Sequence, residues 1–278
     1  MTRKAGVLGH PISHSLSPVL HRAAYAELGL DWDYQAYDVE SGGLQEFLAR
    51  VDRDWAGLSL TMPLKVEAVA LVDFIEPFAK LLGVINTVVV SGRDASLQLV
   101  GANTDVHGIV AALGERDVEA VERGVVVGGG ATAVSAVAAL GQLGCTRPTI
   151  LVRSRARAGA VVRAASAMGL DARLVDLADA DAVRAALGSA EAVVSTIPAD
   201  AGAVLADSLP DVSGVLLDAV YDPLVTPLAH AWLGRGGVQV GGERMLLHQA
   251  GEQVRLMTGR LAPLAAMDAA LQGVLPRP

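Results

Sequence analysis

Gly124-Val125-Val126-Val127-Gly128-Gly129-Gly130-Ala131-Thr132-Ala133 is the stretch that decides the fold of the second half of the chain. A strand pattern runs directly into a glycine turn, and an alanine-rich helix follows to about Leu143. Gly128, Gly130 and Ala133 match the G-x-G-x-x-A pattern of dinucleotide-binding folds, in which the glycines let the backbone turn tightly and approach a pyrophosphate. A glycine turn without a ligand is the alternative, and the strand and helix on either side make it the weaker one.

The rest of this half repeats the alternation of strand and helix. Further strands are predicted at residues 149–152, 172–175, 192–195 and 215–218, with helices between them. Such a series is typical of a doubly wound, Rossmann-type domain. Two more helices are predicted at about residues 244–258 and 261–275.

A separate alternation occupies the first hundred residues. Strands at 5–8, 34–39 and 57–60 with helices at 18–28 and 44–50 favour a mostly parallel sheet flanked by helices. Ser17 is a plausible cap for the first helix, because Pro18 suits its first position. A helix from Lys65 to about Val72 and strands at 84–90 and 97–100, joined by a turn at 91–94, complete the pattern.

The prediction is therefore an α/β chain of two domains. Residues 1–105 form a mostly parallel α/β domain, and residues 106–240 form the Rossmann-type domain, with the boundary placed where the pattern restarts. The helices in residues 241–278 are expected to return to the N-terminal domain and pack on it.

Composition excludes several classes of function. The 278 residues are 52% hydrophobic and 19% charged, which is typical of an α/β enzyme, and the net charge of -8 argues against a nucleic-acid partner. We recognise no signal peptide and no membrane-spanning run, so the cytoplasm is the expected compartment. Cys145, the single cysteine, is expected to be a buried structural thiol, and the six histidines lack the spacing of metal ligands. A monomer and a homodimer both remain open.

The end of the second strand in the Rossmann-type pattern indicates which dinucleotide would bind. An NAD site usually has an acidic residue there for the ribose 2'-hydroxyl, whereas arginine suits the 2'-phosphate of NADP. This chain has Arg153-Ser154-Arg155-Ala156-Arg157 and no acid, which favours NADP because forked guanidinium groups bind a dianionic phosphate. For Arg155, a solvated position at a helix start is an equal alternative.

The first half holds more polar residues than a plain scaffold needs. Gly9-His10-Pro11-Ile12-Ser13-His14-Ser15-Leu16-Ser17-Pro18 follows the first strand, and open α/β folds bind ligands at the carboxyl ends of strands. Lys65 and Asp105 lie in two further polar clusters. A lysine and a carboxylate in one site can move a proton at a carbinol while a dinucleotide transfers the hydride.

Five separated segments resemble the shikimate dehydrogenase family, in the right order and over nearly the whole chain. They are His14-Ser15-Leu16-Ser17-Pro18, Leu60-Thr61-Met62-Pro63-Leu64-Lys65, Val84-Ile85-Asn86-Thr87, Gly101-Ala102-Asn103-Thr104-Asp105 and Met245-Leu246-Leu247-His248-Gln249-Ala250. The resemblance implies reversible, NADP-linked reduction of 3-dehydroshikimate to shikimate in aromatic amino-acid biosynthesis.

The resemblance also implies roles for individual residues. Lys65 and Asp105 match the family's catalytic pair. The positions that match its substrate-binding residues are Ser15, Ser17, Thr61, Asn86, Tyr221 and Gln249. The positions that match its dinucleotide contacts are Gly128, Gly129, Gly130, Ala131, Arg153, Ser154, Arg157, Ala219 and Gly242.

The chemistry of these residue types agrees with the implied roles. A polyhydroxylated acid needs many uncharged donors and acceptors, which hydroxyl and amide side chains supply. Hydride reduction of a ketone leaves an alkoxide, which needs a proton donor or a cation within about 3 Å. Lys65 can be either, although it must be uncharged to accept a proton in the oxidation direction. Asp105 would orient Lys65 and hold a substrate hydroxyl.

Other interpretations stay open on the sequence alone. Ser17 and Asp105 could be helix caps, Lys65 a solvated surface residue, and Tyr221 a core residue whose hydroxyl bonds the backbone. For the whole chain, one alternative is a quinate/shikimate dehydrogenase that prefers NAD. Another is a non-catalytic dinucleotide-binding protein, which would be expected to lack Lys65 or Asp105.

Overall fold

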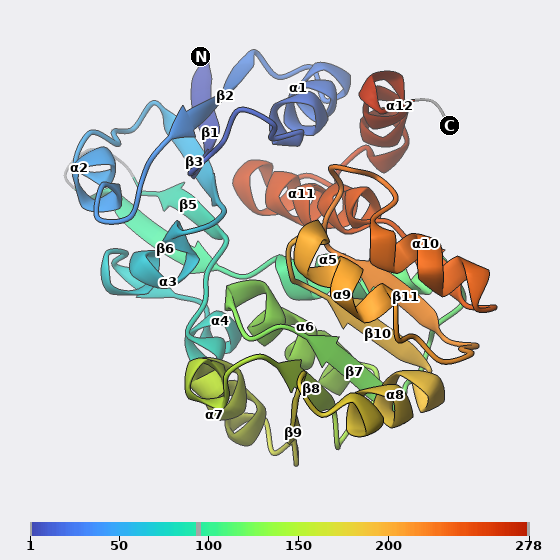
Figure 1. Cartoon of the computed structure of the whole chain (residues 1–278). Coiled ribbons are helices and arrows are strands. Elements are labelled where there is room, and N and C mark those ends of the chain that lie inside the picture. Colours follow the sequence, from blue (N-terminus) through green and yellow to red (C-terminus); the bar gives the residue numbers. More distant parts are fainter. Residues whose placement is uncertain (1, 93–95, 277–278) are drawn as a thin grey trace. The chain divides into compact units, whose positions relative to one another are not determined.

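Two units make up the structure, a computed structural model that describes residues 2–92 and 96–276 (Figure 1). The first unit runs to Thr104 and resumes at Leu246, and the second covers Asp105–Met245. Positions 93 and 94 of the expected turn lie outside the described residues, and so does the side chain of Arg157.

A mixed sheet forms the centre of the first unit. Its strands lie side by side in the order β2 (Trp32–Asp38), β1 (Arg3–Gly9), β3 (Trp55–Leu60), β5 (Thr87–Ser91), β6 (Gln98–Ala102) and β4 (Phe74–Ile75). β1 is parallel to β2 and β3, whereas β5 is antiparallel to both β3 and β6. The carboxyl ends of β1, β3 and β6 and the amino end of β5 therefore lie at one edge of the sheet.

Helices pack on this sheet and create two hydrophobic cores. One core holds Ala5 and Val7 together with side chains of α1 (Ser17–Glu27), α11 (Gly242–Thr258) and α12 (Leu264–Val274). The other holds Leu8 together with side chains of α2 (Leu44–Leu48), α3 (Leu64–Glu67) and α4 (Pro77–Leu82). Because successive residues of β1 enter different cores, both faces of this strand are buried from Ala5 on, and this part of its sequence is apolar without alternation.

The second unit has the parallel sheet of a Rossmann-type fold. Its strands lie in the order β12 (Val238–Val240), β11 (Val215–Asp218), β10 (Ala192–Ser195), β7 (Gly124–Val127), β8 (Thr149–Val152) and β9 (Arg173–Asp176). All of the described pairings are parallel. The chain order reverses at β7, which is the point where sheets of this kind bind ligands.

Six described helices accompany this sheet. One core joins it to α8 (Ala180–Ser189), α9 (Ala199–Ala206) and α10 (Pro227–Gly234). The other three, α5 (Asp105–Gly114), α6 (Ala131–Gln142) and α7 (Gly159–Ala167), lie side by side, and α6 contacts β7 and β10. The predicted fold class is confirmed: the chain has two α/β units, one of them Rossmann-type, and its last two helices belong to the first unit from Leu246 on.

Some elements differ from the expectations. The strand expected from residue 84 begins at Thr87, and the helix expected from Lys65 to Val72 ends at Glu67 and continues as a 3-10 turn, Ala68–Ala70. The short elements β4, α4 and β12 were not predicted, because segments of two to six residues are too short to show a hydrophobic period.

The expectation that Ser17 caps α1 is wrong. Leu16 occupies the capping position without a side-chain cap, although Pro18 lies in the first turn as expected. Ser15 Oγ accepts the backbone N–H of Ser17 at 3.4 Å. Ser17 is buried near Tyr34: burial raises the pKa of Tyr34, and the Ser17 hydroxyl opposes this shift, so Ser17 has a tertiary neighbour and does not cap the helix.

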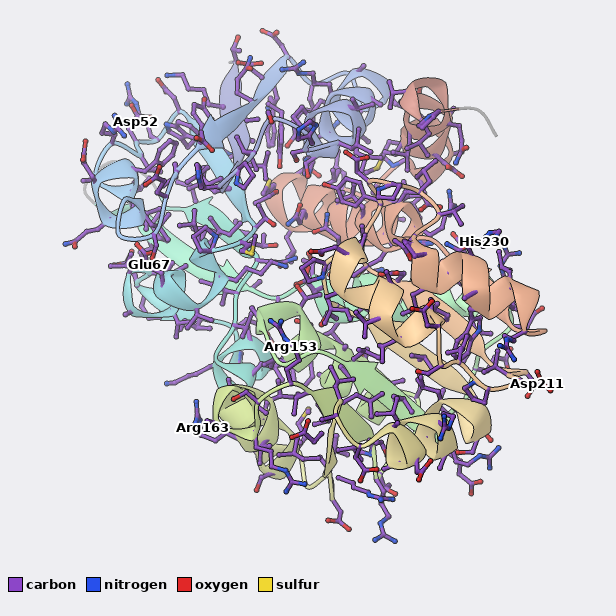
Figure 2. The ribbon with its side chains drawn as sticks, in the orientation of Figure 1. Asp52, Glu67, Arg153, Arg163, Asp211 and His230 are labelled. Atoms are coloured by element: carbon purple, nitrogen blue, oxygen red, sulfur yellow. The ribbon has the colours of Figure 1, made fainter. Side chains whose placement is uncertain are left out.

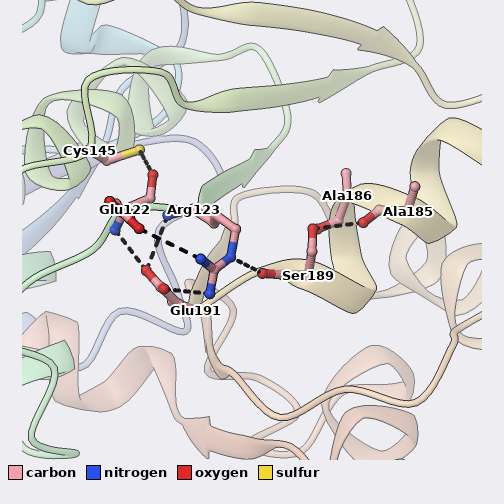
Figure 3. A network of polar contacts seen from close by, with 7 residues as sticks. All are labelled: Glu122, Arg123, Cys145, Ala185, Ala186, Ser189 and Glu191. Carbon is pink, nitrogen blue, oxygen red and sulfur yellow. Dashed lines mark hydrogen bonds and ion pairs between the residues drawn. The ribbon is translucent and has the colours of Figure 1, made fainter.

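A polar network joins the starts of β7 and β10 in the second unit (Figure 3). The Glu191 carboxylate accepts the backbone N–H groups of Glu122 and Arg123 at 2.7 and 3.1 Å, and these bonds lower the pKa of Glu191. Arg123 Nε donates to the Ser189 carbonyl at 2.8 Å. Cys145 Sγ donates to the Glu122 carbonyl at 3.3 Å, and burial raises the pKa of this thiol. Cys145 is therefore a buried structural thiol, as expected.

Within the described part of the chain, no helix is both long enough and apolar enough to cross a membrane.

Candidate active site

Polar residues gather at the edge of the first sheet where the strand ends meet. They come from the loop after β1, the segment after β3, the residue before β5, and the segment after β6. This group comprises Ser15, Ser17, Thr61, Lys65, Asn86 and Thr104. Because these segments leave the sheet at the same edge, the topology brings together residues that are widely separated in the sequence.

Lys65 is buried on the short helix α3, with 9% of its surface exposed. Its backbone carbonyl accepts the N–H of Ile85 at 3.0 Å, which ties α3 to the segment that carries Asn86. The interpretation of Lys65 as a solvated surface residue is therefore excluded. A buried amine at a polar sheet edge can hold or move a proton.

Asn86 and Gln249 form a hydrogen-bonded cluster with Thr104. Asn86 Oδ1 accepts the Thr104 N–H at 2.8 Å, and this backbone donor identifies which atom of the amide is the oxygen. Asn86 Nδ2 consequently donates to Thr104 Oγ1 at 2.9 Å and to Gln249 Oε1 at 3.2 Å. The structure thus brings two predicted substrate-binding residues together, one from the start of β5 and one from α11. Thr104 was not among the site residues predicted from the sequence, although it directly follows Asn103 in one of the segments that resemble the family.

Thr61 is half-buried beside the end of β1. Its backbone N–H donates to the Leu8 carbonyl at 2.9 Å, and its own carbonyl accepts from Leu64 at 2.9 Å. These bonds fix the turn between β3 and α3, which carries both Thr61 and Lys65.

Asp105 and Tyr221 belong to the second unit. Asp105 follows Thr104 directly in the chain, begins α5 and is 3% exposed. Tyr221 is half-buried in the segment after β11. The pairing of Asp105 with Lys65, and a place for Tyr221 in the substrate site, stay predictions.

The glycine turn of the second unit has the geometry that its sequence predicts. Gly128 has a φ of +121°, and a Cβ at this position would lie 2.3 Å from Thr196 Oγ1. Gly130 occupies the capping position of α6 without a side-chain cap, so backbone N–H groups at this helix end are open to a ligand. Ala133 is fully buried, which fits a close approach of α6 to the sheet.

A cavity of about 690 Å³ opens beside this turn. Its lining is mostly apolar and comes from the ends of β7, β8, β9 and β10 and from α9. The lining residues are Gly128, Gly129, Gly130, Val152, Arg153, Ser154, Leu177, Ile197, Pro198, Ala201, Val204 and Leu205. None of the described residues in this lining is acidic. Arg153 is exposed at the cavity, and its side chain is labelled in Figure 2.

Five of the residues that match dinucleotide contacts line this cavity, namely the three glycines, Arg153 and Ser154. Ala131, Ala219 and Gly242 are not among its lining residues. Ala219 and Gly242 lie together, since a Cβ on Gly242 would be 2.5 Å from the Ala219 carbonyl oxygen. The cavity residues after β10 were not predicted from the sequence, although their place at the carboxyl end of a central strand was a usable signal.

Asp218 is a buried carboxylate at the end of β11, next to Ala219. Burial raises the pKa of Asp218, and Thr226 Oγ1 donates to its Oδ2 at 2.6 Å. This bond connects the end of β11 to the start of α10.

Among the described residues, no group of three or more His, Cys, Asp or Glu side chains could hold a metal ion. A dinucleotide, by contrast, fits the second unit. The bend at Gly128 has no room for a side chain, and the cavity beside it combines an apolar wall with one arginine.

A parallel sheet in 3-2-1-4-5-6 order, with a glycine turn and an arginine at its switch point, defines the class of dinucleotide-binding α/β proteins. Two family profiles match the chain: "Shikimate dehydrogenase substrate binding domain" over residues 7–88 and "Shikimate 5'-dehydrogenase C-terminal domain" over residues 242–272. Shikimate dehydrogenase (NADP(+)) of Symbiobacterium thermophilum is 35% identical over 289 residues, which cover 98% of this chain and 95% of the relative. The chain belongs to the shikimate dehydrogenase family.

Solved structures agree with this assignment. The crystal structure of Mycobacterium tuberculosis shikimate dehydrogenase matches with a TM-score of 0.89 and 40% identity, over 98% of this chain and 100% of that chain. The Thermus thermophilus shikimate 5-dehydrogenase in complex with NADP(H) and shikimate matches with a TM-score of 0.82 and 30% identity, over 98% and 100%.

Proposed function

We propose that this protein catalyses the reversible NADPH-dependent reduction of 3-dehydroshikimate to shikimate, in the pathway that makes the aromatic amino acids. One observation supports the proposal above others. The first unit has a buried lysine at the same sheet edge as a cluster of hydroxyl and amide groups, in a chain that matches this family over 98% of its length.

The substrate is a ring with several hydroxyl groups and one carboxylate. Ser15, Ser17 and Thr61 offer hydroxyls, and Asn86 and Gln249 offer amides, so the site supplies donors and acceptors without net charge. We assign the substrate to these residues and propose Tyr221 as a sixth contact. The hydrogen bond between Asn86 and Gln249 holds two of these amides in fixed orientations before any substrate binds.

Lys65 and Asp105 are the proposed catalytic pair. Reduction of the ketone leaves negative charge on its oxygen, and the Lys65 ammonium stabilises that charge and then donates the proton. In the oxidation direction, neutral Lys65 removes the proton from the substrate hydroxyl. The Asp105 carboxylate orients the lysine and accepts a hydrogen bond from the substrate hydroxyl. NADPH supplies the hydride when it is bound.

The proposed dinucleotide site is the glycine turn of the second unit. Residues 128–131 would face the pyrophosphate, and Arg153, Ser154 and Arg157 would face the 2'-phosphate. Ala219 and Gly242 would contribute backbone contacts. The absence of an acid from the described cavity lining supports NADP, because a carboxylate would repel the phosphate.

The proposed compartment is the cytoplasm, and both a monomer and a homodimer are compatible with the proposal. The purified protein should produce NADPH absorbance from NADP in the presence of shikimate. A quinate/shikimate dehydrogenase with a preference for NAD would instead show a higher kcat/KM with NAD. No turnover with either nicotinamide cofactor would overturn the proposal.

A further inference from the structure

Gln253 lies at the centre of a buried hydrogen-bond network in the first unit, on α11, and is 1% exposed. Its Oε1 accepts from Ser59 Oγ at 2.7 Å and from His21 Nε2 at 3.2 Å. Its Nε2 donates to Thr87 Oγ1 at 3.0 Å and to the Asn86 carbonyl at 3.2 Å. These bonds use every donor and acceptor position of a side-chain amide.

The partners permit one orientation of this amide. Nε2 must face the Asn86 carbonyl, because two oxygens without a hydrogen between them repel each other. Oε1 must then face Ser59 and His21, so His21 donates from Nε2. The Nδ1 atom of His21 in turn accepts from the Tyr25 hydroxyl at 3.2 Å. Turning the Gln253 amide over would break bonds on both sides at once.

One branch of the network leads to the substrate-binding amides. Thr87 Oγ1 accepts from Gln253 and gives its own hydrogen to Asn86 Oδ1 at 2.8 Å. With Oδ1 held in this way, Asn86 Nδ2 faces Gln249 Oε1 at 3.2 Å. Gln253 lies four residues after Gln249 on the same helix, so α11 carries the amides at both ends of this branch.

A second branch leads to Tyr34 on β2. Ser59 Oγ donates to Gln253 and accepts from the Tyr34 hydroxyl at 2.6 Å. The Tyr34 ring stacks on His21 with the ring centroids 4.0 Å apart. Burial raises the pKa of Tyr34, and the nearby hydroxyls of Ser59 and Ser17 oppose this shift. Gln253 is thus connected to Tyr34, a neighbour of Ser17, as well as to Asn86.

We propose that Gln253 is a positioning residue of the substrate site, whose buried amide fixes the side chain of Asn86 through Thr87. The proposal rests on the proposed function, because it assigns Asn86 to the substrate. With 1% exposure, Gln253 acts through its partners and not by touching a ligand. A purely structural amide would stabilise the first unit without a selective effect on substrate binding.

Two variants of nearly unchanged shape test the proposal. Gln253→Glu keeps the acceptor oxygens for Ser59 and His21 and removes the donors to Thr87 and Asn86. Thr87→Val keeps Gln253 and removes the hydroxyl that links it to Asn86. Both should raise the KM for shikimate about tenfold or more, as expected for the loss of a buried hydrogen bond. The KM for NADP should change less than about twofold. The factor by which kcat changes should be smaller than the factor by which the KM for shikimate rises.

Gln239→Glu is the matched control. Gln239 is a half-buried amide on β12 in the second unit, where its Nε2 donates to the Leu224 carbonyl at 3.4 Å. This variant should keep the wild-type KM for shikimate, even if its Tm falls as far as that of the test variants.

An unchanged KM for shikimate in either folded test variant would overturn the proposal, and so would an equal rise in the KM for NADP. If one of the two variants does not fold, the other decides the outcome. A wild-type protein that does not turn over shikimate would contradict the proposed function, which the variants do not address.

Discussion

Lowering the pH should destabilise the first unit through the buried imidazole of His21. Burial lowers the pKa of His21 from 6.5 to about 3, against the opposing effect of its hydrogen bond with Gln253. In the unfolded chain the imidazole takes up a proton near pH 6.5, whereas in the folded chain it stays neutral down to about pH 3. Unfolding therefore binds a proton in this window, and stability is lost as the pH falls.

The size of the effect follows from the two pKa values. Each pH unit below 6.5 should cost about 1.4 kcal/mol, which gives about 2 kcal/mol at pH 5 and of order 5 kcal/mol near pH 3. The His21→Phe variant keeps an aromatic ring beside Tyr34 but has no group that titrates. It should be less stable than the wild type at pH 7.5, because Gln253 loses a donor, and its stability should depend less on pH.

Urea unfolding at pH 7.5 and pH 5.0 measures this difference. In a Trp232→Phe background the remaining tryptophans, Trp32 and Trp55, both report on the first unit. His14→Phe makes the same substitution at an exposed position of that unit and should keep the wild-type dependence on pH. If wild type and His21→Phe lost the same free energy of unfolding between the two pH values, His21 would not be the source of the pH dependence.

Three further substitutions test the sites. Lys65→Met should lower kcat by about 10²-fold or more with a smaller change in KM. The matched variant Lys80→Met, at an exposed position, should keep the wild-type kcat. An unchanged kcat in Lys65→Met would rule out proton transfer by Lys65. Arg153→Asp should raise the KM for NADP by about 10- to 100-fold while that for NAD changes little, and equal losses would contradict a contact with the 2'-phosphate. Gly128→Ala places a Cβ 2.3 Å from Thr196 Oγ1 at a φ of +121° and should weaken NADP binding in calorimetry, unlike Gly114→Ala, whose Cβ meets no atom within 4 Å. Wild-type affinity in Gly128→Ala would show that the turn tolerates a side chain.

The parts of the fold that the sequence predicts well are those with a strong local signal. The run from Gly124 to Ala133 combines a buried strand, a glycine turn and a helix within ten residues, so tertiary contacts are not needed to recognise it. The two-residue strand β4 has no such signal, because its pairing with β6 depends on residues distant in the sequence. Ser17 was misassigned as a cap for the same reason, since its neighbour Tyr34 is on β2, distant in the sequence.

The residues of the candidate site also divide into those with a local signal in the sequence and those without one. Hydroxyl and amide residues in polar segments, such as Asn86 and Thr61, are visible in the sequence. The cavity wall that Ile197 and Pro198 form is not, because apolar lining residues have the same composition as core residues. Gln253 could have been suspected, because it is a polar residue one turn after Gln249 and next to the core residue Val254. Its four partners lie on other elements of the first unit, so only the fold shows what it connects.

The most direct test of the central claim is a steady-state assay of the purified chain with shikimate and quinate, each with NADP and with NAD. We expect shikimate with NADP to have the highest kcat/KM of the four combinations. Turnover that favours NAD, or the absence of turnover with shikimate, would contradict it.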